Sequence, residues 1–474
     1  MKRLMGDGDN IAENLRSYIQ AFSPAVRDIF DSFEFHLQVD RLDKANLLYL
    51  VTEKFGQIDL HPETVSNAEM GLVFEELIRK FAELSNETAW EHFTPREVIR
   101  LMVNLIFIED DEALTQPGIV RSPYDPTAGT GGMLSVAEEH LVSHNPSARW
   151  AGHQQHLLRQ HPLRRPAAGG EVRLHAFQPA IWPGVEEDSE GGPREAELMG
   201  YSGRFGPGLP RVSDGSLLFL LHLISKMRPA QDGGCRFGIV LNGSPLFTGG
   251  AGSGESEIRR DVLENDLLEA IIALPTDMFY NTGISTYIWI LSNRKPEERK
   301  GKVQLIDASG FWQKMRKSLG SKRKELAAEH IEEITKLFGD FEDAEKHGKP
   351  ISKVFKNEDF GYQTITVERP LRVEDGNVVL EQRGKAKGQP QADSSLRDTE
   401  NVPLSEDVEA YVEREVLPHV PDAWIDHSKT KKGDEIPFNR HFYVFTPPRP
   451  LEEIDAELKQ VTDRILEMIG GLSG

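Results

Sequence analysis

The segment from Asp125 to Met133 has the residue types and spacing of a ligand-binding turn. It reads Asp-Pro-Thr-Ala-Gly-Thr-Gly-Gly-Met and follows a short apolar run at Ile119–Tyr124. A strand that leads into a glycine-rich turn and then a helix lets the backbone approach a nucleotide-like ligand closely. The turn is not Gly-x-Gly-x-x-Gly, and it lacks the lysine of a phosphate-binding P-loop. Taken alone, it also fits an ordinary tight turn between a strand and a helix.

A second element, His92-Phe93-Thr94-Pro95-Arg96, precedes this turn. Together the two elements resemble the cofactor site of the amino-methylating DNA methyltransferases. The turn is similar to their S-adenosylmethionine loop, and the upstream element is similar to the one that closes over the methionine end of that cofactor. The resemblance implies S-adenosylmethionine as the cofactor, bound by His92, Phe93, Thr94, Pro95, Arg96, Asp125, Pro126, Thr127, Ala128, Gly129, Thr130, Gly131 and Gly132.

Most of the chain resembles the modification (M) subunit of type I restriction–modification systems. The resemblance implies an α/β fold, with an N-terminal helical domain, a Rossmann-like S-adenosylmethionine-dependent methyltransferase domain and a C-terminal helical tail. It also implies methylation of the exocyclic amine of adenine. The implied partners are DNA, a specificity (S) subunit that reads the DNA site, a nuclease (R) subunit and a second M subunit. Further similar segments are Gly71–Thr94, Asp214-Gly215-Ser216, Val240–Phe247, Ile258-Arg259-Arg260, Leu274-Pro275 and Phe279–Gly283.

One motif of that family is absent between the glycine-rich turn and Leu241: Asn-Pro-Pro-Phe (or Tyr), at the end of the fourth strand. In such enzymes the Asn side chain and a Pro carbonyl hold the amine of a flipped adenine, and an aromatic ring stacks on the base. These acceptors orient the nitrogen toward the methyl group, so positioning supplies most of the catalysis. The motif is expected near Phe177–Trp182, and the catalytic residues of this chain are therefore unknown.

A shifted reading frame accounts for the missing motif. Moved forward by one nucleotide, the codons of Val172–Trp182 can spell Phe-Asp-Phe-Met-Leu-Ser-Asn-Pro-Pro-Phe-Gly. His153–Pro166 and Pro183–Glu190 also allow family-like residues in the shifted frame. We therefore hypothesise that residues 149–193 are out-of-frame sequence. We expect this segment to leave a gap or a disordered loop beside Gly131, where the central strand of the sheet should lie.

Two other segments of the family are missing after Arg149: a Gly-Gln-Glu segment, whose acid holds the cofactor ribose, and an Ala-Asp segment near the adenine ring. We infer that some sequence was also deleted there. The short helical sequence before Phe93 predicts a truncated N-terminal domain. We predict no metal site, because the spacing within the aberrant segment gives no paired ligand motif for His153, His156, His161 and His175.

The elements that must position these residues fall into three predicted regions. Residues 1–90 are predicted to be helical, from apolar residues three and four apart at Ile19–Phe33 and Met70–Leu84. Residues 91–310 form the Rossmann-like domain, where short apolar runs alternate with helices and predict a mostly parallel sheet. The strands are predicted at Ile119–Tyr124, Phe237–Leu241, Leu268–Leu274, Thr286–Leu291 and Val303–Ile306, and the helices at Thr94–Ile108, Leu134–Val142, Ser216–Met227 and Ile258–Glu264.

The third region, residues 311–474, begins with a charged stretch at 311–340 that predicts helix. A segment at about 375–398, rich in Gly, Gln, Lys and Ser, predicts a linker or an exposed loop. The tail at 451–469 carries an a/d seam about 2–3 heptads long. Two interpretations of it stay open, a helix packed on its own domain or a helix that pairs with a partner subunit. The seam residues are Leu451, Ile454, Leu458, Val461, Ile465 and Met468.

Composition sets limits on these hypotheses. The single cysteine, Cys235, excludes an internal disulfide framework and a cysteine-built zinc site. No apolar run approaches the roughly 20 residues of a membrane span, and we expect a cytoplasmic protein without membrane contact. The net charge of −21 repels a phosphate backbone. We therefore expect contact with DNA to depend on other chains of a complex.

Three features after the glycine-rich turn allow more than one interpretation. Asn242 and Ser244 fit a structural turn at a strand end better than a functional site. The Gly249–Gly254 segment lacks a P-loop lysine, which favours a mobile loop near DNA over a phosphate cradle. Arg259 and Arg260 fit either contacts with DNA phosphates or ordinary surface ion pairs.

The leading hypothesis is an M subunit whose methyltransferase activity is impaired by the missing motif. The alternative is a non-catalytic assembly or DNA-tethering subunit with the same fold, since a fold alone does not guarantee a function. An unrelated nucleotide-binding enzyme such as a dehydrogenase is disfavoured, because the sequence lacks Gly-x-Gly-x-x-Gly after a strand.

Overall fold

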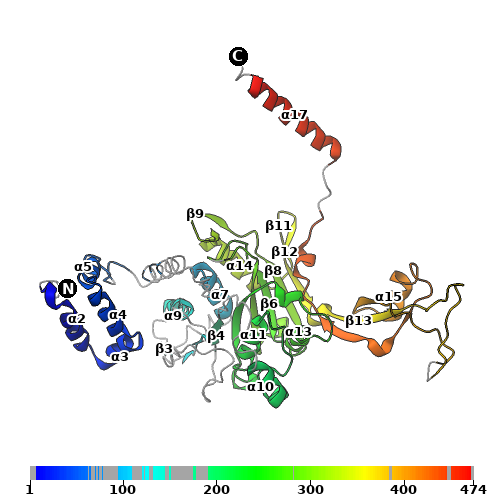
Figure 1. The fold of residues 1–474 in the computed structure, drawn as a ribbon, viewed down its shortest axis with the longest axis horizontal. Helices are drawn as coiled ribbons and strands as arrows, with labels where there is room; N and C mark the ends of the chain where they lie inside the picture. Colours follow the sequence, from blue (N-terminus) through cyan, green and yellow to red (C-terminus); the bar gives the residue numbers. More distant parts are fainter. Residues whose placement is uncertain are drawn as a thin grey trace. The chain divides into compact units, whose positions relative to one another are not determined.

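The computed structural model describes residues 7–61, 63–65, 70, 73, 77, 94–108, 120–121, 123–126, 132–144, 149–150, 174–177, 191–280, 282–383, 387–445 and 450–470. The chain divides into two compact units, Met1–Thr88 and Ala89–Gly474. Figure 1 shows their helices and strands. Among the described residues, no helix combines the length and the apolar composition that crossing a membrane requires.

The first unit consists, in its described part, of short helices around a small core. They are α2 (Ile11–Gln20), α3 (Pro24–Ser32), α4 (Phe35–Lys44) and α5 (Leu48–Gly56). The apolar repeat from Ile19 to Phe33 is divided between α2 and α3, because Pro24 opens α3 and fixes a helix start there. The predicted helix at Met70–Leu84 lies outside the described residues except at 70, 73 and 77.

The second unit is built on an eight-stranded sheet. Along the sheet the strands follow the order β11 (Ala344–Lys346), β12 (Lys349–Lys356), β8 (Lys302–Asp307), β6 (Leu268–Ala273), β7 (Thr286–Ser292), β5 (Arg236–Asn242), β4 (Leu174–Phe177) and β2 (Pro123–Tyr124). Beside it, β1 (Val120–Arg121) pairs in parallel with β3 (Arg149–Trp150).

The strand directions correct the expectation of a mostly parallel sheet. β2, β4 and β5 are mutually parallel, as are β6 and β8. β7, however, is antiparallel to both of its neighbours, β5 and β6. The reason lies in the connection from β6 to β7, since a parallel return needs a crossover, usually a helix. Residues 274–285 contain no helix in their described part, so the chain turns back directly.

The expectation of a gap in the sheet is wrong for the backbone. Leu174–Phe177 forms β4, which lies between β2 and β5 and pairs in parallel with both. The tetrapeptide Leu-His-Ala-Phe suffices to fill the strand position, because backbone hydrogen bonds do not depend on the side chains. The residues on either side of β4, 151–173 and 178–190, lie outside the described part.

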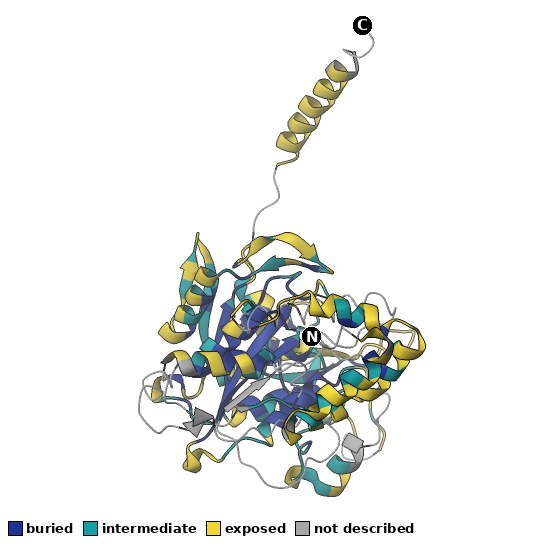
Figure 2. Ribbon diagram, turned by 90° about the vertical axis from the view of Figure 1, so that its left-hand side faces the viewer, coloured by how far each residue is buried: buried dark blue, intermediate teal, exposed yellow. Residues whose placement is uncertain are grey.

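Helices cover both faces of this sheet, and its strands β5, β6, β7 and β8 are largely buried (Figure 2). One core joins the sheet to α7 (Arg96–Phe107), α9 (Gly132–His144) and α14 (Ala328–Asp340). The other core joins it to α11 (Ser216–Ile224) and α13 (Gly254–Glu264). The strands from β5 to β8 and the helices α7, α9, α11 and α13 lie where the sequence predicts them, within a few residues.

The stretch at 311–340, predicted to be helical throughout, is a hairpin followed by a helix. β9 (Gln313–Leu319) and β10 (Lys322–Glu325) pair antiparallel, and α14 comes only afterwards. Gly320 and Ser321 connect the two strands, and Gly320 has a φ of +59°, which favours glycine. This turn and the tertiary contacts of the hairpin override the helical charge pattern.

The segment expected as a linker at about 375–398 is an exposed arm whose backbone pairs with itself. Leu371 N donates to Gln391 O at 2.8 Å, and Gln391 N donates to Val379 O at 2.8 Å. The arm follows β13 (Gly361–Glu368), which pairs with β14 (Asp398–Pro403), β15 (Trp424–Ile425) and β16 (Lys431–Asp434). α15 (Val408–Glu415) packs against this smaller sheet.

The tail forms a helix, α17 (Leu451–Gly470). Its heptad residues are exposed, and Figure 2 shows its described residues in the exposed colour: Leu451, Ile454, Leu458, Val461, Ile465 and Met468.

Candidate active site

The carboxyl ends of three parallel strands define the edge of the sheet at which the predicted site residues lie. β2 ends at Tyr124 and leads into Asp125 and Pro126, both half-buried. β4 and β5 run parallel to β2 and end at the same edge. In open α/β sheets, ligands bind outside the carboxyl ends of the strands. This edge is therefore the candidate active site.

Thr94, one of the predicted cofactor residues, lies at the start of α7. The carbonyl of Pro95 accepts hydrogen bonds from Val98 N and Ile99 N, both at 3.0 Å, which fixes the first turn of the helix. The Thr94 side chain is buried, and among the described residues its hydroxyl has no hydrogen-bond partner. A buried polar group without a partner is costly. The orphaned hydroxyl fits a ligand that would complete its bonding.

The far end of the glycine-rich turn meets the same helix. Gly132 opens α9, and a Cβ built on it would lie 3.4 Å from Ile99 Cδ1 of α7. The structure thus packs α7, which begins directly after Thr94 and Pro95, against the start of α9 at Gly132, and Asp125 and Pro126 lie at the other end of the turn. The remaining predicted cofactor residues lie outside the described part: His92, Phe93, Thr127, Ala128, Gly129, Thr130 and Gly131.

A chain of polar side chains anchors the end of β2, and no local sequence pattern indicates it. Tyr124 Oη lies 3.2 Å from His222 Nε2, and Arg204 Nη1 lies 3.2 Å from His222 Nδ1. Arg204 also pairs with Glu195 at 2.6 Å. Because a guanidinium only donates, Nδ1 of His222 must accept, so the ring is neutral with its proton on Nε2. Tyr124 Oη then accepts that proton's hydrogen bond.

Electrostatics agree with this assignment. Burial, together with the charge of Arg204, lowers the pKa of His222 to about 4. Burial and the nearby carboxylate of Asp125 raise the pKa of Tyr124 to about 12. Both side chains are therefore uncharged at neutral pH. They position the strand end that carries Asp125 without adding charge to it.

We expect the folded state to lose stability in acid through His222. Its pKa is about 4 when folded and about 6.5 when unfolded, so between these values the unfolded chain binds a proton that the folded chain does not. The stability that depends on the neutral ring is present above pH 6.5 and falls as the pH drops toward 4, by up to about 3 kcal/mol. His222→Gln should remove this dependence, because an amide can still accept from Arg204 and donate to Tyr124.

The measurement is the melting temperature of both proteins from neutral pH down to pH 4.5, near the lower end of that window. Burial raises the pKa of Asp434 to about 6, which acts in the opposite direction over the same range. Asp434 titrates in both proteins, so the comparison isolates His222. A difference in melting temperature that stays constant across the range would contradict the prediction.

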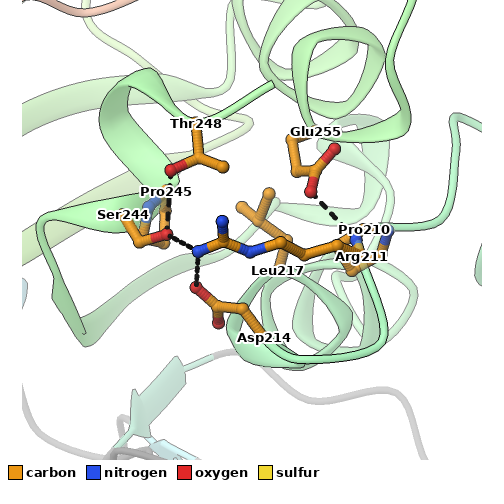
Figure 3. A pocket seen from close by; sticks show the side chains of 8 residues that line it. All are labelled: Pro210, Arg211, Asp214, Leu217, Ser244, Pro245, Thr248 and Glu255. Atoms are coloured by element: carbon orange, nitrogen blue, oxygen red, sulfur yellow. Dashed lines mark hydrogen bonds and ion pairs between the residues drawn. The ribbon is translucent and has the colours of Figure 1, made fainter. Parts of the chain in front are cut away.

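A small pocket lies beside the end of β5, and Figure 3 shows the residues that line it. The Arg211 side chain points toward Ser244, donating to its Oγ at 2.8 Å, and lies 3.8 Å from Asp214. Asn242 Oδ1 accepts from Ser244 N at 2.9 Å. Asn242 thus caps the turn that opens α12 (Ser244–Phe247), in agreement with its structural interpretation.

The structure contradicts both sequence interpretations of Arg259, a contact with DNA phosphates and a surface ion pair. It is buried and donates to carbonyl oxygens of Asp434, Pro245, Thr248 and Gly249, at 2.6 to 3.0 Å. It therefore contacts neither solvent nor a DNA phosphate, and the Gly249–Gly254 loop is anchored rather than mobile. Arg260 forms a surface ion pair with Glu257, as its second interpretation predicts.

Comparison with known proteins decides the family. The family described as N-6 DNA methylase matches residues 65–158 and 196–369, more than half of the chain. The chain belongs to the N-6 DNA methylase family. Of the predicted cofactor residues, all thirteen lie within the first matched segment. The match is interrupted at residues 159–195, and most of these residues belong to the segment 149–193 that is hypothesised to be out of frame.

Proteins similar to this chain carry consistent names. The type I restriction enzyme MjaIX methylase subunit of Methanocaldococcus jannaschii is 25% identical over 329 residues, 65% of this chain and 55% of that protein. The MjaVIII methylase subunit of the same organism is 39% identical over 123 residues, 26% of this chain and 20% of that protein. The chain spans about half the length of the first of these relatives.

The methylase fold is supported by a solved structure. The methyltransferase subunit of a type I restriction–modification system from Streptococcus thermophilus superposes with a TM-score of 0.51 at 20% identity, covering 75% of this chain and 76% of that chain. The α/β fold expected from the sequence is thereby confirmed. Its sheet is mixed rather than mostly parallel.

Proposed function

We propose that this chain is the modification subunit of a type I restriction–modification complex, belonging to the class that transfers a methyl group from S-adenosylmethionine to the exocyclic amine of adenine. The observation that carries the proposal is the family match across both elements of the candidate active site. Its relatives are named as methylase subunits of type I restriction enzymes, which supports a role within a complex.

The described residues fit the cofactor. Thr94 offers a buried hydroxyl without a partner, and Asp125 offers a carboxylate at the end of β2. Thr94, Asp125, Pro126 and Gly132 would hold S-adenosylmethionine, with the rest of the two predicted elements. When bound, that cofactor supplies an electrophilic methyl group on a sulfonium ion. The carboxylate suits a ligand with positive charge and hydroxyl groups.

The substrate amine requires acceptors directly after β4. The chain there reads Gln178-Pro179-Ala180-Ile181 in place of Asn-Pro-Pro-Phe. We propose that methyl transfer is impaired for this reason. The interruption of the family match at 159–195 supports the hypothesis that this segment is out of frame.

Thr94→Val tests the cofactor site. Valine keeps the shape of threonine and removes the hydroxyl, so S-adenosylmethionine should bind about 3- to 10-fold more weakly, as one lost hydrogen bond implies. Titration calorimetry measures this. The melting temperature should stay the same or rise, because the orphaned buried group is gone.

Thr430→Val is the matched control. The Thr430 hydroxyl is also buried without a partner among the described residues, but it lies just before β16, in the smaller sheet. Its removal should leave cofactor affinity unchanged. Equal affinities for the wild type and Thr94→Val would remove Thr94 from the cofactor site. Absence of any binding by the wild-type chain would contradict the proposed function.

A second candidate function is a non-catalytic subunit that assembles the complex or tethers it to DNA. The exposed heptad face of α17 favours it, because such a face suits pairing with a partner helix of the S subunit. DNA, the S and R subunits and a second M subunit are the proposed partners in either case. A chain that assembles with its S subunit but neither binds S-adenosylmethionine nor methylates DNA has this second function.

A further inference from the structure

The hairpin of β9 and β10 is a basic surface in an acidic protein. Residues 313–325 carry six lysines and arginines and one acid, Glu325, whereas the whole chain has a net charge of −21. The acid is engaged, since Gln313 Nε2 donates to Glu325 Oε1 at 2.9 Å. Four of the cations are exposed on this element, named here the basic hairpin: Lys314, Arg316, Lys317 and Arg323.

The arrangement of these charges is unfavourable for the hairpin itself. Lys314 lies directly opposite Lys324 in the antiparallel register. Like charges directly opposite each other destabilise a strand pair. Trp312, which is 40% exposed, lies beside them, with Lys324 Nζ at 4.4 Å from its ring centre. Lys324 Nζ also donates to Thr276 Oγ1 at 3.1 Å. The exposed cations that remain around the aromatic ring are explained by an anionic partner that binds them.

The root of the basic hairpin is fixed to the candidate active site. Lys322 is buried and forms an ion pair with Glu97, in the first turn of α7. Glu97 follows Thr94 by three residues, so the hairpin joins the protein where the cofactor element begins. The turn at Gly320 is held from the other side, because Ser321 N donates to Tyr280 O at 2.7 Å. The hairpin is therefore a rigidly rooted ribbon beside the place where a target base must enter.

We propose that the basic hairpin binds the phosphate backbone of duplex DNA and holds it at the candidate active site. The inference rests on the proposed function, which brings DNA to this edge of the sheet. Lysines and arginines on a two-stranded ribbon, with an exposed tryptophan, have the chemistry of nucleic-acid contact. The position at the mouth of the site favours DNA over an acidic protein segment as the partner.

The test compares two full-length variants, each with four exposed cations neutralised. The hairpin variant is K314Q/R316Q/K317Q/R323Q. The control is K300Q/K302Q/K349Q/K356Q, which changes net charge equally on exposed residues elsewhere in the second unit. Fluorescence anisotropy measures binding of a labelled 30-base-pair duplex, about three helical turns, to each chain assembled with its S subunit, over a series of salt concentrations from about 50 mM upward.

At the lowest salt, the hairpin variant should bind the duplex at least about tenfold more weakly than the control variant, because it has lost phosphate contacts. Each lost contact should also reduce the slope of log affinity against log salt concentration by about 0.9. Its melting temperature should not fall, since a repulsive pair is relieved. Equal binding by the two variants, or no binding by the wild type at low salt, would overturn the proposal. Titration with S-adenosylmethionine separates the two proposals. If neither the wild type nor either variant binds the cofactor, only the proposed function is contradicted. If the hairpin variant binds the cofactor normally, its cofactor site is intact.

Discussion

Replacing Val172–Trp182 with Phe-Asp-Phe-Met-Leu-Ser-Asn-Pro-Pro-Phe-Gly is expected to raise methyl transfer to DNA at least about 100-fold. The physical reason is that the strand is already in place. β4 lies between β2 and β5, so the restored acceptors would follow its last residue at the edge where Asp125 lies. Correct placement of acceptors around the reacting nitrogen supplies the rate increase.

The assay uses labelled S-adenosylmethionine at saturating concentration, with the S subunit present. Saturation matters because the Gly-Gln-Glu segment that holds the ribose is also missing, and its loss weakens binding rather than the transfer step. The matched control carries alanine in place of the restored asparagine and should return to the low rate. A wild-type chain as active as the restored one would contradict the impairment. Sequencing of codons 145–197 tests the cause, because an undisturbed frame excludes the frameshift.

Glu269→Gln is expected to cost about 3–5 kcal/mol in the free energy of unfolding. Glu269 and Arg236 are fully buried and joined by two hydrogen bonds of 2.9 Å, and Arg299 lies 3.4 Å from the same carboxylate. An amide retains the shape but removes the negative charge. Two buried guanidinium groups then lose the charge that compensates them.

Urea unfolding followed by tryptophan fluorescence measures this cost in the second unit, because all six tryptophans of the chain lie there. The control is Glu297→Gln, which breaks an exposed ion pair with Lys300 and should change the free energy of unfolding by less than about 1 kcal/mol. If the two substitutions cost the same, the buried network does not stabilise the fold in the way described.

Local sequence predicted the buried part of the sheet well. β6 and β7 each contain an apolar run, Ala270–Ala273 and Tyr287–Leu291, and burial on both faces makes such runs recognisable. The direction of β7 could not be predicted in the same way, because it depends on a connection without a helix. The basic hairpin was mistaken for helix since six cations on a short segment carry no strand alternation.

The motif residues of the candidate site and the polar side chains that anchor it were predictable to different extents. Thr94, Asp125 and Gly132 belong to contiguous motifs, so they could be found from the sequence. The bond between Tyr124 and His222 joins residues 98 positions apart, and no local pattern relates them. The structural role of Arg259 could not be predicted for the same reason, since its acceptors include Asp434, 175 positions away.

The position of Arg259 has a consequence for how the second unit opens. Its guanidinium binds carbonyls on both the Pro245–Gly249 segment and the end of β16, so neither segment can leave while the other stays fully bonded. The planar fork matches several acceptors at once, which a lysine ammonium cannot reproduce. The loop beside the end of β5 and the smaller sheet therefore unfold together as one cooperative unit, although almost 200 residues of chain separate them.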